Sequence, residues 1–75
     1  MVKIAARLQE LRKEKRFTQK DMAAQLGIKT RTYQYYEADD HRPDYETLIS
    51  LAEFFGVTTD YLLGYSDIRR PTGTG

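Results

Sequence analysis

The sequence predicts an all-α fold, a compact bundle of five short helices. Apolar residues recur at three- and four-residue spacing in five segments, and no segment alternates apolar and polar residues as a strand would. Gly27, Pro43 and Gly56 separate the last four segments from one another. Because the chain has 75 residues, we expect one domain over residues 1–65, followed by a polar tail or linker over residues 66–75.

The first helix is predicted over residues 3–15, where Ile4, Leu8 and Leu11 form one apolar stripe. This helix has no glycine at its end. A left-handed ending at Arg16 would cost roughly 1 kcal/mol, so we expect either that strain or a looser ending.

The next two helices are predicted over residues 19–26 and 30–37. Thr18 caps the first of them with Asp21 as its capping-box partner, and Gly27 ends it in the left-handed conformation. Two short helices joined by so tight a turn form a helix-turn-helix unit, here residues 18–37. In such a unit the second helix is presented to the major groove of DNA.

That second helix has two different sides. Tyr33 and Tyr36 share a side with Ile28 and are expected to face the core, with their hydroxyl groups reaching water or a polar partner. The outward side then consists of Thr30, Arg31, Gln34 and Tyr35. For Tyr35, a packing role inside the protein is as well supported by the sequence as an outward position.

Two further helices follow, over residues 45–55 and 59–63. Asp44 and Thr58 cap them, and Gly56 and Gly64 end them. The last helix is too short to bury all its apolar residues on one side. We therefore expect a surface for a second copy of the chain at this helix and its exit: Tyr61, Leu62, Tyr65 and Ile68.

Composition excludes several classes of function. The chain has no cysteine and one histidine, so disulfides, thiolate metal sites and a metal site built on histidines are excluded. No residues form a catalytic triad, a phosphate-binding loop or a pair of inward carboxylates, so we expect no enzyme and no cofactor or small-molecule ligand. No membrane span or secretory signal is present either, which favours a cytoplasmic protein.

Charge is distributed unevenly along the chain. Residues 1–37 contain nine Lys and Arg against four Asp and Glu, a net charge of +5, whereas residues 38–75 contain three against seven, a net charge of −4. The basic part contains the helix-turn-helix unit, which favours a nucleic-acid partner. An ordinary solvated surface with uneven charge is the simpler alternative.

Four segments, in this order and at this spacing, resemble the Cro/phage-repressor (XRE-like) type of helix-turn-helix domain: RLQELRKEK, FTQKDMAAQLGI, TYQYYE and RPDYETLISLAEFFGVTTDYLLG. The resemblance spans residues 4–64. It implies the lambda-repressor-like fold and a sequence-specific regulator of transcription, a repressor, that binds double-stranded DNA through residues 30–37.

The resemblance also implies roles for individual residues. Gln19 matches a glutamine that contacts a DNA phosphate and braces the recognition helix, while Arg12 and Glu37 match a partly buried salt bridge. Arg31 is the strongest candidate for reading a base, because a guanidinium can bond guanine O6 and N7 together. The remaining DNA-contacting candidates are Lys29, Thr30, Thr32, Gln34, Tyr35 and Arg42.

Three positions depart from the family pattern. Lys29 occupies the usual Ser/Thr cap, so either Thr30 caps one residue late or the N–H groups are left for a phosphate. The loop after Glu37 contains Asp39 and Asp40, which repel phosphate and leave His41 and Arg42 as its only cationic candidates. A tyrosine at position 35 favours stacking on a base or sugar.

We therefore expect a homodimer in the bacterial or phage cytoplasm, associated with the nucleoid and bound to a palindromic operator. The alternative is a protein-interaction module, similar to an antitoxin or a regulator's partner, built on the same fold. The acidic part of the chain favours this alternative, whereas the basic part and Arg31 oppose it.

Overall fold

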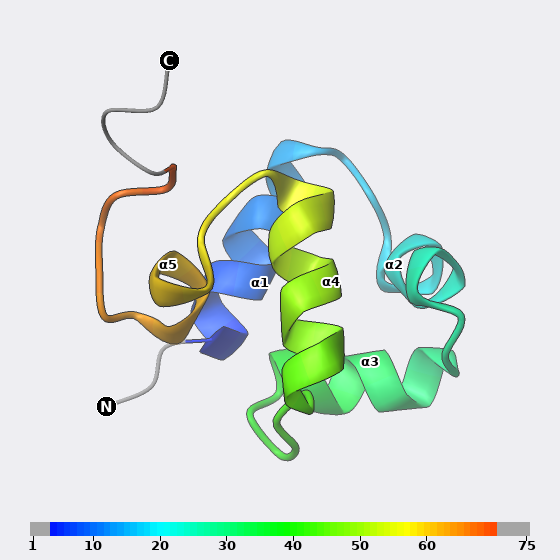
Figure 1. Cartoon of the computed structure of the whole chain (residues 1–75). Coiled ribbons are helices and arrows are strands. Elements are labelled where there is room, and N and C mark those ends of the chain that lie inside the picture. Colours follow the sequence, from blue (N-terminus) through cyan, green and yellow to red (C-terminus); the bar gives the residue numbers. More distant parts are fainter. Residues whose placement is uncertain (1–3, 71–75) are drawn as a thin grey trace.

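The computed structural model describes residues 4–70 and confirms the all-α, five-helix fold. The helices are α1 (Ile4–Glu14), α2 (Gln19–Leu26), α3 (Thr30–Glu37), α4 (Tyr45–Phe55) and α5 (Thr59–Leu63). In Figure 1, α4 stands upright in front of α1. Helix α2 lies to the right of α4, α3 lies below it, and α5 lies to its left. The predicted start of the first helix at Lys3 lies outside the described residues, and the helix ends at Glu14 instead of Lys15.

Local sequence signals set the helix ends as predicted. The Thr18 hydroxyl accepts a hydrogen bond from the Asp21 N–H (3.0 Å), and the Asp21 carboxylate accepts one from the Thr18 N–H (2.9 Å). Gly27 ends α2 at a φ of 68°. Arg16 adopts the strained left-handed conformation at a φ of 60°. Of the two endings left open for α1, the structure therefore has the left-handed one and not the looser one.

The core contains side chains from all five helices. Leu8, Met22, Tyr33, Leu51 and Leu62 are fully buried at its centre. Phe17 packs its ring against Phe54, with ring centroids 5.7 Å apart. Within this core, α3 packs against α1 and α2, so the core determines which side of α3 faces outward.

The end of the helical domain differs from the prediction. Tyr61 and Leu62, expected at a surface, are 5% and 0% exposed, because α5 packs these two side chains inward against α1 and α4. Tyr65 and Ile68 remain exposed.

Residues 66–70 also differ from the prediction, because they do not extend away as a tail. The Thr58 N–H donates to the Arg69 carbonyl (2.7 Å), and the Arg69 guanidinium donates to the Glu14 carboxylate (2.8 Å). The Arg7 guanidinium, also on α1, donates to the Asp67 carboxylate (2.8 Å). Residues 66–70 are therefore anchored to α1 and to the start of α5, whereas the predicted tail at residues 71–75 lies outside the described residues.

Candidate nucleic-acid interface

The outward side of α3 carries most of the predicted contact residues. Lys29, Arg31 and Gln34 are exposed, whereas Thr30, Thr32 and Tyr35 are half-buried. Among residues 4–70, Arg31 has no ion-pair partner, so its guanidinium is free to bind a ligand. Lys29 immediately precedes α3, the other five residues lie on it, and Arg42 lies beyond its end in the loop before α4.

The start of α3 has no side-chain cap. Lys29 occupies the cap position with extended backbone and forms no capping hydrogen bond, so the first of the two alternatives, a cap one residue late by Thr30, is wrong. Thr30 is instead the first residue of the helix. Free N–H groups at a helix start, together with the helix dipole, favour an anion such as a phosphate.

Glu37, at the other end of α3, connects three helices. Its buried carboxylate accepts hydrogen bonds from Arg12 Nε (2.7 Å) and Nη2 (3.1 Å) on α1, and from the Gln19 amide (3.1 Å) on α2. The Arg12–Glu37 salt bridge that the resemblance implied is therefore present. The Gln19 amide braces α3, and its predicted phosphate contact stays a prediction.

The charge of Glu37 is maintained despite its burial. Burial favours the neutral acid, but hydrogen bonds from Arg12 and Gln19 and the charge of Arg12 outweigh it, so the pKa of Glu37 is lowered. The Tyr33 hydroxyl is buried, and no group of residues 4–70 forms a hydrogen bond with it, so the expected polar partner is not found there and a contact with water stays a prediction. Burial, followed by the Glu37 carboxylate, raises the pKa of Tyr33, so this hydroxyl stays neutral.

Gln9 is a brace that the sequence prediction missed. Its amide donates to the backbone carbonyl of Glu37 (2.9 Å), satisfying one of the free carbonyls at the end of α3. The signal was present, because Gln9 lies three residues before Arg12 and therefore on the same side of α1.

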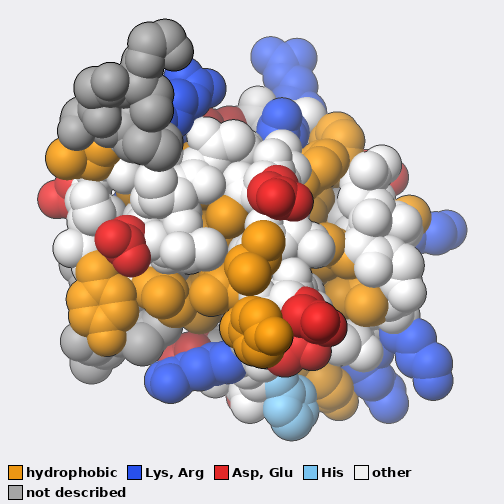
Figure 2. Space-filling model, viewed as in Figure 1, with side chains coloured by type: hydrophobic (Ala, Val, Ile, Leu, Met, Phe, Trp, Pro, Cys, Tyr) orange, Lys and Arg blue, Asp and Glu red, His pale blue; other side chains and the backbone are white. Residues whose placement is uncertain are grey.

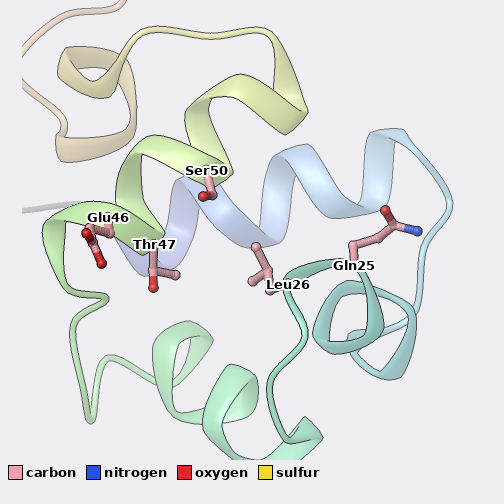
Figure 3. Close-up of a pocket in the computed structure, with 5 residues that line it drawn as sticks. All are labelled: Gln25, Leu26, Glu46, Thr47 and Ser50. Atoms are coloured by element: carbon pink, nitrogen blue, oxygen red, sulfur yellow. The ribbon is translucent and has the colours of Figure 1, made fainter.

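Two surface pockets border these helices. One, of about 390 Å³, is lined by Gln9, Arg12, Gln19, Gln34, Glu37 and Ala38, and therefore joins the braces to the outward side of α3. The other, of about 180 Å³, lies between α2 and α4 and is lined by Gln25, Leu26, Glu46, Thr47 and Ser50 (Figure 3). None of the predicted contact residues lines this second pocket.

The loop after α3 is acidic and folds back onto the helix. Asp39 and Asp40 are exposed, and Asp39 adopts a left-handed φ of 62°. His41 packs its ring against Tyr35, and Arg42 is exposed. In Figure 2 the pale blue histidine lies at the lower edge, and several Lys and Arg side chains project at the lower right, where Figure 1 places α2 and α3.

Other kinds of site find no support in residues 4–70. No group of three or more His, Cys, Asp or Glu side chains there could hold a metal ion. No helix in the same part of the chain is long and apolar enough to cross a membrane.

Comparison with known proteins agrees with this geometry. The model of the family described as "Helix-turn-helix" matches residues 8–62. The chain belongs to this helix-turn-helix family. It is 37% identical over 71 residues to the HTH-type transcriptional regulator ImmR of Bacillus subtilis, covering 95% of this chain and 56% of ImmR. It is also 47% identical over 58 residues to the regulator AnsR of the same organism, covering 77% and 50% of the two chains.

A phage protein and a solved structure extend the comparison. The transcriptional repressor RstR of the cryptic phage CTXphi in Vibrio cholerae is 35% identical over 63 residues, covering 84% of this chain and 56% of RstR. The crystal structure of a transcriptional regulator from Listeria innocua superposes with a TM-score of 0.83 at 36% identity, covering 88% and 62% of the two chains. This helix-turn-helix chain therefore spans 50–62% of the length of these relatives.

Proposed function

We propose that this chain is the DNA-binding part of a sequence-specific transcriptional regulator, a repressor, which places α3 in the major groove of double-stranded DNA. The observation that supports this proposal most directly is the outward side of α3. Its Arg31 is exposed, has no ion-pair partner among residues 4–70, and lies on a helix that Arg12, Gln19 and Gln9 brace through Glu37. The names of the relatives support the regulatory role.

The test uses Arg31→Ala on the duplex that the parent protein selects from a random pool. Loss of a bidentate contact to guanine weakens binding by about 1–3 kcal/mol and relaxes base preference at one position of each half-site. Lys20→Ala is the control, because Lys20 is an exposed cation on α2 outside the predicted contacts. Equal affinities of parent and Arg31→Ala across a salt titration would refute the assignment of Arg31.

We propose further that the protein binds a palindromic operator as a homodimer. Within residues 4–70, four large apolar side chains are exposed: Tyr45 (73%) and Ile49 (43%) on α4, and Tyr65 (79%) and Ile68 (54%) after α5. Figure 2 shows hydrophobic side chains in a band across the face that carries α4 and α5. A second copy that packs on this face covers the exposed side chains and leaves both α3 helices free.

The dimensions of the domain suit this arrangement. The domain measures 37 × 25 × 21 Å, and the half-sites of such operators lie ~34 Å apart, one helical turn of DNA. Ile49→Arg should separate the copies. In a titration of a palindromic duplex followed by sedimentation, the two half-sites should then each bind one domain independently, without cooperativity. Cooperative binding by both the parent and Ile49→Arg would exclude this face as the interface.

A regulator of this kind acts at the chromosome, so we propose a cytoplasmic, nucleoid-associated protein without enzymatic activity. Its affinity for random duplex DNA should fall steeply with salt, because phosphate contacts release counterions. An affinity that does not depend on salt would favour the protein-interaction alternative.

A further inference from the structure

The ring of Tyr35 has one aromatic neighbour, His41, outside its own helix. The two ring centroids lie 4.9 Å apart with the planes at 66°, an edge-to-face contact. His41 itself is exposed, whereas Tyr35 is half-buried. The contact therefore covers part of the tyrosine ring on the outward side of α3, next to the exposed Gln34.

The backbone of the loop holds His41 in this position. The N–H groups of Asp40 and His41 both donate to the carbonyl of Tyr35, at 3.0 and 3.3 Å. The left-handed conformation of Asp39 reverses the chain between Ala38 and these bonds. As a result, residue 41 returns to residue 35, and the edge-to-face contact follows from the path of the loop.

This contact restricts the tyrosine side chain. A tyrosine on the exposed side of a helix can adopt more than one staggered χ1 rotamer. A ring in edge-to-face contact with it disfavours the rotamers that would break this contact. An aromatic ring that is already oriented loses less freedom when it binds a base or sugar, and binding is correspondingly tighter.

We infer that His41 is a positioning residue, which orients Tyr35 for its contact with DNA and does not itself bind a phosphate. This inference rests on the proposed function. The charges around His41 support a role through the ring, because the exposed carboxylates of Asp39 and Asp40 precede it and oppose the approach of a phosphate. The neighbouring Arg42 is the better phosphate ligand in this loop, since it is exposed and permanently charged.

The experiment compares His41→Ala, which removes the ring, with His41→Phe, which keeps a ring and removes any charge. Tyr35→Ala and the double variant with His41→Ala complete a double-mutant cycle. Arg42→Ala is the matched control for a phosphate contact made from the same loop. Affinity, salt dependence and base preference are measured on the duplex that the parent selects from a random pool, well below each variant's unfolding temperature.

The inference predicts that His41→Ala weakens binding about two- to tenfold per half-site, the size of one aromatic pair, and that His41→Phe restores it. His41→Ala should add little in a Tyr35→Ala background and should flatten the same base preference. Its salt slope should equal that of the parent, whereas Arg42→Ala should reduce the slope by about 1 per half-site.

Two results would overturn the inference. The first is His41→Phe binding as weakly as His41→Ala with a reduced salt slope, which identifies His41 as a phosphate ligand. The second is strict additivity of the His41 and Tyr35 substitutions. Failure of the proposed function is distinguishable, because the parent itself would then select no duplex and Arg31→Ala would change nothing.

Discussion

The carboxylate of Glu37 is the group whose removal tests most directly how α3 is held. Glu37→Gln keeps the shape of the side chain but removes its charge and half of its acceptor capacity. Arg12 and Gln19 then compete for one amide oxygen, and the remaining amide group is a donor that faces the Arg12 guanidinium. The substitution therefore separates the charge of Glu37 from its packing.

The expected cost follows from the hydrogen bonds lost. Breaking a buried ion pair by removing one partner costs about 3–5 kcal/mol. Arg12 keeps its bond to the Phe17 carbonyl (2.8 Å) and its side chain is 14% exposed, so part of its charge is satisfied elsewhere. We therefore expect a loss of about 2–3 kcal/mol in the free energy of unfolding, which lowers Tm by about 10–20 °C for a domain of this size.

The pH dependence gives a second readout. The folded-state pKa of Glu37 is lowered below its unfolded value, so its stabilising contribution is complete above the unfolded pKa and is lost as the pH falls through the folded pKa. The difference in stability between parent and Glu37→Gln should therefore be constant near pH 7 and should shrink below about pH 4.

The assay is thermal and denaturant unfolding between pH 3 and 7, followed by circular dichroism. Glu53→Gln is the control, because Glu53 is exposed and forms no ion pair within residues 4–70; it should leave stability unchanged. If Glu37→Gln unfolded within 2 °C of the parent at pH 7, Glu37 would not brace α3 in the way that its contacts indicate.

Two further predictions concern local structure. Gly27→Ala should lower stability by roughly 1 kcal/mol through backbone strain alone, because φ is 68° and the added Cβ would meet no atom within 4 Å apart from those of residues 26–28; Gly27→Asn should lose less in the same unfolding assay. Arg69→Ala should release residues 66–70, so chymotrypsin should cleave at the exposed Tyr65 faster with little change in Tm. The charge swap Arg69→Glu with Glu14→Arg should restore protection, and equal cleavage of all three proteins would show that this ion pair does not anchor the segment.

Features determined by neighbouring residues were predictable from the sequence. The capping box of Thr18 and the left-handed Gly27 depend on residues within a few positions, and both were predicted correctly. The strained Arg16 was one of two endings that the sequence left open for α1. The inward sides of Tyr33 and Tyr36 followed from helical spacing alone. The Arg12–Glu37 pair depends on distant residues, and the family resemblance, not the spacing, supplied it.

The errors lie where distant residues decide the structure. Residues 66–70 have the composition of a tail, and their anchoring depends on Arg7 and Glu14 at the opposite end of the chain. The burial of Tyr61 likewise depends on α1: its hydroxyl donates to Glu10 (2.9 Å), and the Arg7 guanidinium lies 3.8 Å from its ring centroid. Composition and periodicity contain no information about such pairings, so the last helix was assigned an exposed surface that it does not have.

The anchoring of residues 66–70 also bears on the order in which the domain assembles. The contacts of α1 with this segment join residues 55 to 60 positions apart, whereas α2 and α3 are neighbours along the chain, separated by the three residues Gly27, Ile28 and Lys29. Contacts between distant residues require the largest loops to close, and during synthesis they form only after almost the whole domain has left the ribosome. Of the five helices, the first to be synthesised is therefore among the last to be fully packed, because its buried side chains Ile4, Leu8 and Leu11 share the core with α5, and residues 66–70 follow α5.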